Sequence, residues 1–295
     1  MDIAITGATG LIGTALSAHL TASGHTVVPV TRSGNEGVGW DPAEGRIDAA
    51  GFEGLDAVVH LAGEGIGNRR WNDQTKARIL DSRVDGTGLL AQTLAGLDNP
   101  PSVLLSGSAI GFYGDRGDEI LDEDAGKGDG FLADVVEQWE AAAAPAIDAG
   151  IRTCFLRTGI VLTPKGGALA KLLPLFKLGA GGKMGSGKQY WSWIGMRDQV
   201  GMIEWLLTAD VSGPVNLTGP DPVTNTEFTK TLGRVLGRPT MLPVPAFGPK
   251  LVIGSELAKE LLFTSTRAVP SVATSGGYQF ADDTLEAALS VLLSK

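Results

Sequence analysis

The sequence is poor in cysteine and has no excess of positive charge. A single cysteine, Cys154, stands among 295 residues. An intramolecular disulfide is therefore excluded, and the place of Cys154 beside Phe155 and Leu156 favours a buried thiol over a nucleophile. Lys and Arg number 24 against 33 Asp and Glu, giving a net charge of −9 that argues against a nucleic-acid partner.

Long apolar runs and a basic leader are also missing. No apolar stretch reaches the length that spans a bilayer, and the first strand follows Met1 directly. We therefore expect a cytoplasmic protein with no membrane partner, and no group of residues suggests a metal site. With 43% hydrophobic and 19% charged residues, the chain can build one large α/β domain, or a large and a small one.

The stretch Asp2 to Gly13, which reads DIAITGATGLIG, organises the chain. Ile3 and Ile5 alternate as in a short strand, and three glycines at three-residue spacing lead into an apolar helix. Such a turn brings backbone close to a pyrophosphate, and the helix start directs free N–H groups at it. A glycine triplet alone is weak, but this strand-to-helix context favours a cofactor site. The residues that we expect to form it are Gly7, Thr9, Gly10, Leu11, Ile12 and Gly13.

The end of the second strand, His25 to Thr31, indicates which cofactor is bound. An NAD site places Asp or Glu there, whereas this strand ends in Thr31, Arg32 and Ser33. A cation and hydroxyl groups suit a 2′-phosphate, so the sequence predicts NADP. The alternative is an arginine that only faces water.

The segment Leu55 to Gly63 predicts a buried parallel strand. Its carboxyl end, at Leu61, Ala62 and Gly63, should face the ligand crevice. His60 precedes that end and has no acidic partner in the sequence. We therefore interpret it as an interior histidine rather than a catalytic base.

These motifs together resemble the extended short-chain dehydrogenase/reductase superfamily. The motifs are TGATGLIG, TRS and VVHLAG. Later segments resemble an atypical epimerase-family branch of it, namely GEGIGNRRWN, SRVDGT, WEAAA, LRTGIVL, GSGKQYWSWIGMRD and NLTGPDPVTNTEF. The resemblance implies an α/β fold with a Rossmann-type doubly wound parallel sheet and a smaller C-terminal α/β lobe. It places an NADP-binding domain at residues 1–165, rejoined by about 191–218, and a substrate-side lobe at 166–190 and 219–295.

The resemblance also implies roles for single residues. A helix at residues 72–96 carries Arg83 and Arg78, which would face the cofactor phosphates, or else form a solvated basic face. Ser108 ends a strand at residues 102–109 and would bind a substrate carbonyl or hydroxyl. A core strand is expected at residues 153–162, and the backbone of Val161 near its end would meet the nicotinamide amide. A homodimer through residues 72–96 and the helix expected at 131–149 is also implied.

The superfamily's Tyr-x-x-x-Lys pair is absent from the sequence. Its tyrosine and lysine positions fall near Leu132 and Val136, both apolar. Tyr113 is the nearest replacement phenol, with Glu64 and Asp115 as further candidates, because catalysis needs a group of suitable pKa within reach. A second departure is Gly195, where relatives carry a histidine.

The last part of the chain predicts helices at residues 225–236 and 284–293. A glycine-rich loop lies within residues 163–190 and fits a ligand cover or a plain surface loop. The proline-rich connector at 239–249 fits a membrane-surface contact, but its length and prolines favour packing against the main domain.

Two functions remain open from the sequence. One is an NADP(H)-dependent oxidoreductase or epimerase-like enzyme that acts on a carbonyl or sugar-type small molecule. The other is a protein that binds NADP(H) without turnover, as a regulator or scaffold, since some relatives are labelled as cell-division-associated.

Overall fold

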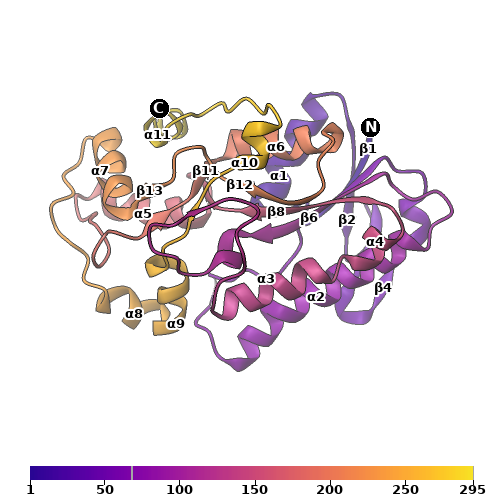
Figure 1. The fold of residues 1–295 in the computed structure, drawn as a ribbon, viewed down its shortest axis with the longest axis horizontal. Coiled ribbons are helices and arrows are strands. Elements are labelled where there is room, and N and C mark those ends of the chain that lie inside the picture. The colour runs from indigo at the N-terminus through magenta and orange to yellow at the C-terminus, as the bar shows by residue number, and fades with distance from the viewer. Residues whose placement is uncertain (68, 295) are drawn as a thin grey trace.

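A central eight-stranded sheet organises the computed structural model, which describes residues 1–67 and 69–294 (Figure 1). The strand order is β12-β8-β6-β5-β1-β2-β3-β4, and every pairing is parallel except that of β3 with β4. The order reverses at β1, so the crevice of a doubly wound sheet opens there. The strands are β1 (Asp2–Thr6), β2 (Thr26–Thr31), β3 (Val38–Asp41), β4 (Arg46–Ile47), β5 (Ala57–His60), β6 (Val103–Ala109), β8 (Arg152–Thr158) and β12 (Gly213–Leu217).

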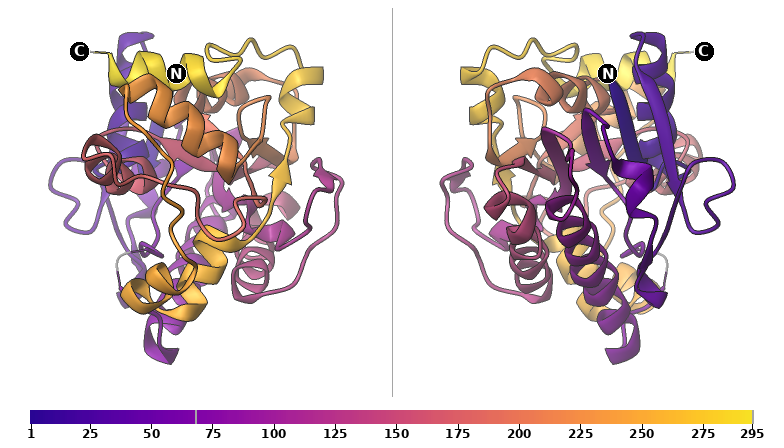
Figure 2. Two further views of the ribbon diagram at one scale, coloured as in Figure 1. Left: turned by 90° about the vertical axis from the view of Figure 1, so that its left-hand side faces the viewer. Right: turned by 90° about the vertical axis from the view of Figure 1, so that its right-hand side faces the viewer.

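Helices cover both faces of this sheet, as Figures 1 and 2 show. Ile3 and Ile5 of β1 pack toward α1 (Leu11–Ala22) and α6 (Met196–Thr208). Ala4 points to the opposite face, where α2 (Asp73–Ala95) packs with α4 (Ala144–Asp148). The alternation of side chains along a strand thus gives the sheet two apolar faces. The expected Rossmann-type fold is confirmed.

Two expected elements are each divided in the structure. The helix expected at 131–149 is α3 (Phe131–Ala141) followed by α4, because Pro145 has no N–H to continue the helical hydrogen bonds. The strand expected to Leu162 ends at Thr158. Beyond it, Ile160–Leu162 pair with Trp193–Gly195 outside the main sheet, and Gly159 lies so close to Ser192 that a Cβ would be 2.5 Å from its carbonyl oxygen. By contrast, residues 72–96, whose apolar spacing fits one long or once-broken helix, form the single unbroken helix α2 between its N-cap Asn72 and its C-cap Gly96.

A second apolar cluster forms the C-terminal lobe. Trp193 and Phe228 lie at its centre, between α5 (Gly167–Lys177), α7 (Asn225–Leu236) and α11 (Leu285–Leu293). The two predicted helices are therefore confirmed. Small sheets join the lobe to the rest of the chain, through β9 (Ile160–Leu162), β10 (Tyr190–Trp191), β11 (Trp193–Gly195), β13 (Val223–Thr224), β7 (Ile120–Leu121) and β14 (Arg267–Ala268). The short elements that remain are α10 (Ser271–Ser275), η1 (Pro42–Glu44), η2 (Ala49–Phe52) and η3 (Ile110–Tyr113).

The connector after α7 is less packed than expected. Its residues 239–246 run beside the glycine-rich loop, and the N–H of Val244 donates to the carbonyl oxygen of Lys183 at 2.8 Å. It leads to α8 (Phe247–Ile253), α9 (Ser255–Ala258) and η4 (Lys259–Phe263). Met241, Leu242 and Phe247 stay exposed, so packing against the main domain accounts for only part of this segment. Within residues 1–67 and 69–294, no helix combines the length and the apolar character needed to cross a bilayer.

Candidate cofactor and substrate site

The turn between β1 and α1 has the geometry that the glycine spacing predicts. Gly7 adopts a φ of +69°, which favours glycine, and its carbonyl oxygen accepts the N–H of Gly10 at 2.9 Å. A Cβ on Gly13 would lie 2.1 Å from that same oxygen, so the closeness of the turn itself excludes a side chain. Gly10 caps α1 without a side-chain hydrogen bond, which leaves the first N–H groups of the helix free for an anion.

A cleft opens in front of this turn, at the carboxyl edge of β1, β2 and β5. Gly7, Thr9 and Gly10 line one side. The other predicted members of the site lie on further walls, with Thr31, Arg32 and Ser33 after β2 and Leu61, Ala62 and Gly63 after β5. Leu11, Ile12 and Gly13 stand behind the turn, where Ile12 packs into the core and Leu11 contacts Gly166. The cleft thus joins three separate predicted segments.

Arg32 is exposed on the rim of the cleft, and it forms no ion pair within the described part of the chain. The Thr31 hydroxyl accepts the N–H of Gly34 at 3.1 Å and so shapes the loop after β2. No Asp or Glu lies among the described residues that line this cleft except Glu64, which follows β5. The rim therefore fits the 2′-phosphate of NADP, and the uncapped helix start fits a pyrophosphate.

Thr6 fixes the wall that follows β5, a role that the sequence did not reveal. Its hydroxyl oxygen accepts the N–H groups of Leu61 (3.1 Å) and Ala62 (3.2 Å), so its proton must point to His60 Nδ1 at 2.7 Å. His60 Nε2 then donates to Thr87 at 3.0 Å. Burial, together with the nearby Arg83, lowers the pKa of His60 to about 4, so the ring is neutral. The interpretation of His60 as an interior residue is confirmed.

A second, largely apolar hollow adjoins the cofactor cleft at the carboxyl ends of β6 and β8. Leu132 and Val136 of α3, Trp139, Ile160 and Trp191 are among its walls. The positions that carry tyrosine and lysine in the superfamily therefore face this hollow as aliphatic side chains. Two charged residues, Arg83 and Glu260, are found among the described residues that line it.

Arg83 stands where the hollow meets the cofactor cleft. Its Nη1 donates to the carbonyl oxygens of Glu64 (3.0 Å) and Ile79 (3.1 Å), and its guanidinium lies against Gly63. Burial lowers the pKa of Arg83 to about 10. The predicted phosphate role of Arg83 stays a prediction, with the guanidinium within reach of both cavities. Arg78 lines neither cavity and donates to Thr75 at 3.4 Å.

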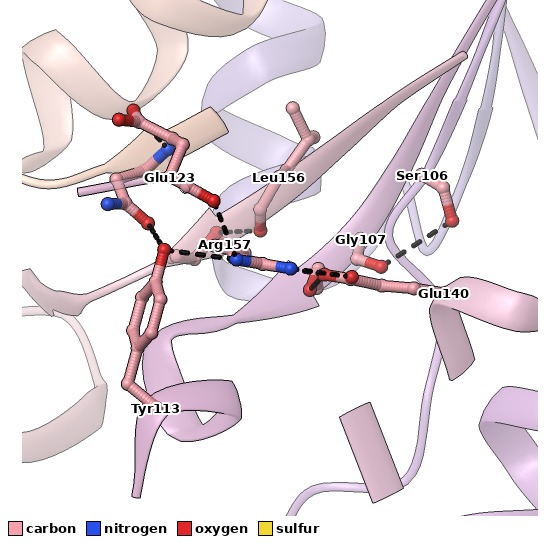
Figure 3. A network of polar contacts seen from close by, with 10 residues as sticks. Ser106, Gly107, Tyr113, Glu123, Glu140, Leu156 and Arg157 are labelled. Carbon is pink, nitrogen blue, oxygen red and sulfur yellow. Dashed lines mark hydrogen bonds and ion pairs between the residues drawn. The ribbon is translucent and has the colours of Figure 1, made fainter. Parts of the chain in front are cut away.

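Ser108 and Tyr113 belong to a buried polar network rather than to the walls of the hollow. Figure 3 shows Tyr113, Glu140 and Arg157 of this network. The Ser108 hydroxyl donates to Glu140 at 2.5 Å, and Arg157 binds the same carboxylate through two N–H groups at 2.9 Å each. Tyr113 is fully buried, donates to Asn216 at 2.8 Å and accepts from Arg157 at 3.1 Å. Burial raises the pKa of Tyr113, so the phenol is held as a proton donor within the network.

The remaining candidate residues have structural roles. Val161 lies in β9 and packs on the core, while its neighbours Gly159 and Ile160 reach the hollow. Asp115 accepts the N–H of Ser265 at 3.2 Å. A Cβ on Gly195 would lie 2.8 Å from Asp282, so this glycine makes room for the segment before α11. In the motif GEGIGNRRWN, Asn68 lies outside the described residues.

Glu140, Arg157 and Glu260 were not identified as functional residues from the sequence. Glu140 and Arg157 do lie in WEAAA and LRTGIVL, two of the motifs that carry the resemblance, but 17 residues separate them and no local pattern pairs them. Glu260 comes from the C-terminal lobe, and only the folded chain brings it to the hollow.

The sheet order, the glycine turn and the cleft at the switch point define a Rossmann-type α/β protein. The family model "NAD dependent epimerase/dehydratase family" matches residues 3–218, and a domain of unknown function, DUF1731, matches residues 244–292. The chain belongs to the NAD-dependent epimerase/dehydratase family.

Named relatives agree with this assignment. An epimerase family protein of Mycobacterium bovis is 42% identical over 97% of this chain and 96% of its own length. The crystal structure of human epimerase family protein SDR39U1 with NADPH is 36% identical, covers 99% of each chain and has a TM-score of 0.91. A structure described as a nucleoside-diphosphate sugar epimerase from Corynebacterium glutamicum is 38% identical, with a TM-score of 0.79, and covers 98% of this chain but 57% of that one.

Proposed function

We propose that this protein is an NADP(H)-dependent oxidoreductase or epimerase-like enzyme that takes a small carbonyl or sugar-type substrate into the apolar hollow. The exposed Arg32 on the rim, opposite the uncapped start of α1, is the observation that carries the proposal. The similar human protein crystallised with NADPH supports the same cofactor. When bound, the cofactor supplies or accepts a hydride.

The walls of the hollow favour a substrate with an apolar body. Ile110, Leu132, Val135 and Ile160 would bury hydrocarbon or ring surface, each apolar contact adding to affinity through loss of water. A carbonyl carbon that receives a hydride leaves its oxygen in need of a proton. Leu132 and Val136 cannot supply one, and the hydroxyl of Ser108 is already donated to Glu140.

We assign this proton transfer to Glu260. Its side chain lines the hollow beside Gly130, where a Cβ would lie 3.0 Å from Glu260 Oε1. Burial raises the pKa of Glu260, with Glu256 and Asp115 acting in the same direction and Lys259 and Lys76 against it. A carboxyl of raised pKa keeps a proton closer to neutral pH, as a general acid requires. Solvent then restores the proton.

A second function rests on a different observation. The aliphatic residues at the tyrosine and lysine positions also suit a protein that binds NADP(H) without turnover, as a regulator or scaffold. In that case the hollow would bind a ligand that changes the state of the protein and then dissociates without having reacted.

One experiment separates the two functions. The purified protein is titrated with NADPH and NADH while tryptophan quenching and nicotinamide fluorescence are followed, and a panel of carbonyl compounds and sugar nucleotides is then added. Tighter binding of NADPH followed by its oxidation with a panel member supports the enzyme. Binding with no oxidation by any member supports the second function, and failure to bind either cofactor refutes both.

A further inference from the structure

Positive charge is concentrated in two segments of this acidic protein. Residues 165–191 contain five lysines, and residues 228–255 contain two lysines and two arginines, while neither segment contains an Asp or a Glu. The whole chain carries a net charge of −9. The two segments thus hold nine of the 24 Lys and Arg residues with no acid among them, and Lys177, Lys183, Arg238 and Lys250 are exposed there.

The same two segments hold most of the exposed large apolar side chains. Leu178 at the end of α5 is 82% exposed, and Met241 and Leu242 on the connector are 88% and 68% exposed. On α8, Phe247, Leu251 and Val252 are 66%, 69% and 71% exposed. Single exposed apolar residues are common, but a cluster of this size at one place marks an interaction surface.

The two segments lie side by side. A Cβ on Gly179 would lie 3.8 Å from Pro239, a Cβ on Gly182 would collide with the carbonyl oxygen of Leu242, and the N–H of Gly185 donates to the carbonyl oxygen of Val244 at 3.1 Å. The left panel of Figure 2 looks onto this side, with the end of α5, the loop, the connector and α8 facing the viewer. We call these exposed cations and apolar residues the basic apolar face.

We propose that the basic apolar face docks the protein on the surface of a bilayer that contains anionic lipids. Apolar side chains on short helices and loops enter the boundary between headgroups and acyl chains, while lysines beside them pair with lipid phosphates and carboxylates. Both kinds of side chain are present here, and they are interleaved: Lys177 precedes Leu178, and Lys250 precedes Leu251 and Val252.

A second copy of this chain is a poorer occupant. A two-fold dimer would place the face against itself, and it carries cations without a carboxylate in either segment. Like charges would then be brought together while the apolar residues are buried. An anionic bilayer complements both properties of the face at once.

The test is co-sedimentation of the full chain with vesicles of phosphatidylcholine, with or without phosphatidylserine. The wild type should sediment with the anionic vesicles, and added salt should release it. Phe247→Ser with Leu251→Ser should lower the partition coefficient about tenfold or more, because two apolar side chains no longer enter the bilayer. Lys250→Gln should lower it roughly fivefold.

Matched controls lie at the other end of the molecule. Ile147→Ser on α4 removes an apolar side chain that is 47% exposed, and Arg46→Gln removes a cation outside the face. Neither should change vesicle binding.

Absence of binding to anionic vesicles overturns the proposal, as does an equal loss of binding in the variants of the basic apolar face and in the control variants. Self-association in sedimentation velocity that Phe247→Ser and Leu251→Ser abolish, without vesicle binding, would assign the face to a second copy instead. Capture of an acidic polypeptide such as poly-glutamate, with no vesicle binding, overturns the lipid assignment too.

Discussion

The carboxylate of Glu140 receives both Nε and a terminal nitrogen of Arg157 at 2.9 Å, and the two side chains are 12% and 5% exposed. This pair joins α3 to β8 (Figure 3). Arg157 also stacks 3.6 Å from the centre of the Phe112 ring. The pair thus holds together the helix and the strand end from which the hollow is built.

Removing one partner of this pair should destabilise the fold strongly. Glu140→Ala leaves the Arg157 charge buried without its carboxylate, and such a loss typically costs about 3–5 kcal/mol. Urea unfolding at neutral pH measures the effect. The pair of Asp41 and the exposed Arg46 provides the control, since Arg46→Ala should cost no more than about 1 kcal/mol. Similar losses in the two variants would contradict the structural role of Glu140.

Arg32 should determine the choice between NADPH and NADH. A charge-assisted hydrogen bond contributes about 1.5–3 kcal/mol, so Arg32→Ala should weaken NADPH binding roughly tenfold to a hundredfold. NADH, which lacks the 2′-phosphate, should bind almost as before. Calorimetric titration of both cofactors gives the comparison, with Arg46→Ala as the control. If both affinities fall equally, Arg32 does not read the phosphate.

Gly13→Ala should disrupt the turn before α1, because the added Cβ would lie 2.1 Å from the carbonyl oxygen of Gly7. We expect loss of cofactor binding in a protein that is less stable by about 1–3 kcal/mol or more. Gly88→Ala is the matched control. It lies in α2 with no atom within 4 Å of the added Cβ, and alanine is the better helix former by about 1 kcal/mol. Intact NADPH binding by the Gly13 variant would refute this account of the turn.

The neutral, buried His60 should make stability fall in weak acid. The unfolded ring, with a pKa of 6.5, takes up a proton before the folded ring, whose pKa is about 4. Its contribution is therefore complete above the unfolded pKa and is lost as the pH falls toward 4, by about 3 kcal/mol. Urea midpoints measured between neutral pH and the folded pKa should show a shallower pH dependence in His60→Asn. Parallel pH profiles for wild type and variant would exclude His60 as the cause.

Glu260→Gln should remove proton donation while leaving the cofactor cleft intact. With a carbonyl compound from the panel, such as benzaldehyde, turnover should drop by roughly 10²–10⁴ and NADPH affinity should stay unchanged. In the wild type, turnover should fall as the pH rises through the raised pKa of Glu260, because the carboxyl then loses its proton. Glu286→Gln, at an exposed carboxylate that pairs with Arg234, is the control. Equal turnover in the two variants would take Glu260 out of the mechanism.

Local patterns in the sequence were enough to predict the segments that line the cleft at the carboxyl edge of β1, β2 and β5. Gly7 to Gly13 and Thr31 to Ser33 are each continuous, and a parallel strand places their ends at one edge. The absence of the tyrosine and lysine could also be recognised from the sequence. Trp139 and Glu140 fix the register of this helix, and the register gives the two positions that the pair would occupy. Homodimerisation through α2 and α3 stays a prediction.

The substrate side could not be predicted in the same way. Glu260 reaches the hollow only because η4 packs against the start of α3, far away in the sequence. The pairing of Glu140 with Arg157 depends on how α3 lies over β8. Because Ser108 donates its hydroxyl to the same carboxylate, it does not take the substrate-binding position expected at the end of its strand. The exposure of α8 depends on tertiary packing as well, whereas the length and prolines of the preceding connector favoured packing against the main domain.

The segment from Phe247 to Phe263 links two surfaces that have been treated separately. Its first part, α8, carries the basic apolar face, and its last part, η4, supplies a wall of the hollow. Arg70 donates to the carbonyl of Val252 at 3.0 Å and Lys76 pairs with Glu256 at 2.6 Å, so the segment is held to the start of α2 as one piece. A ligand of the hollow that moved this segment as a unit would therefore displace α8 together with η4. By thermodynamic reciprocity, the factor by which vesicles would then change the affinity of the hollow equals the factor by which an occupied hollow would change vesicle affinity.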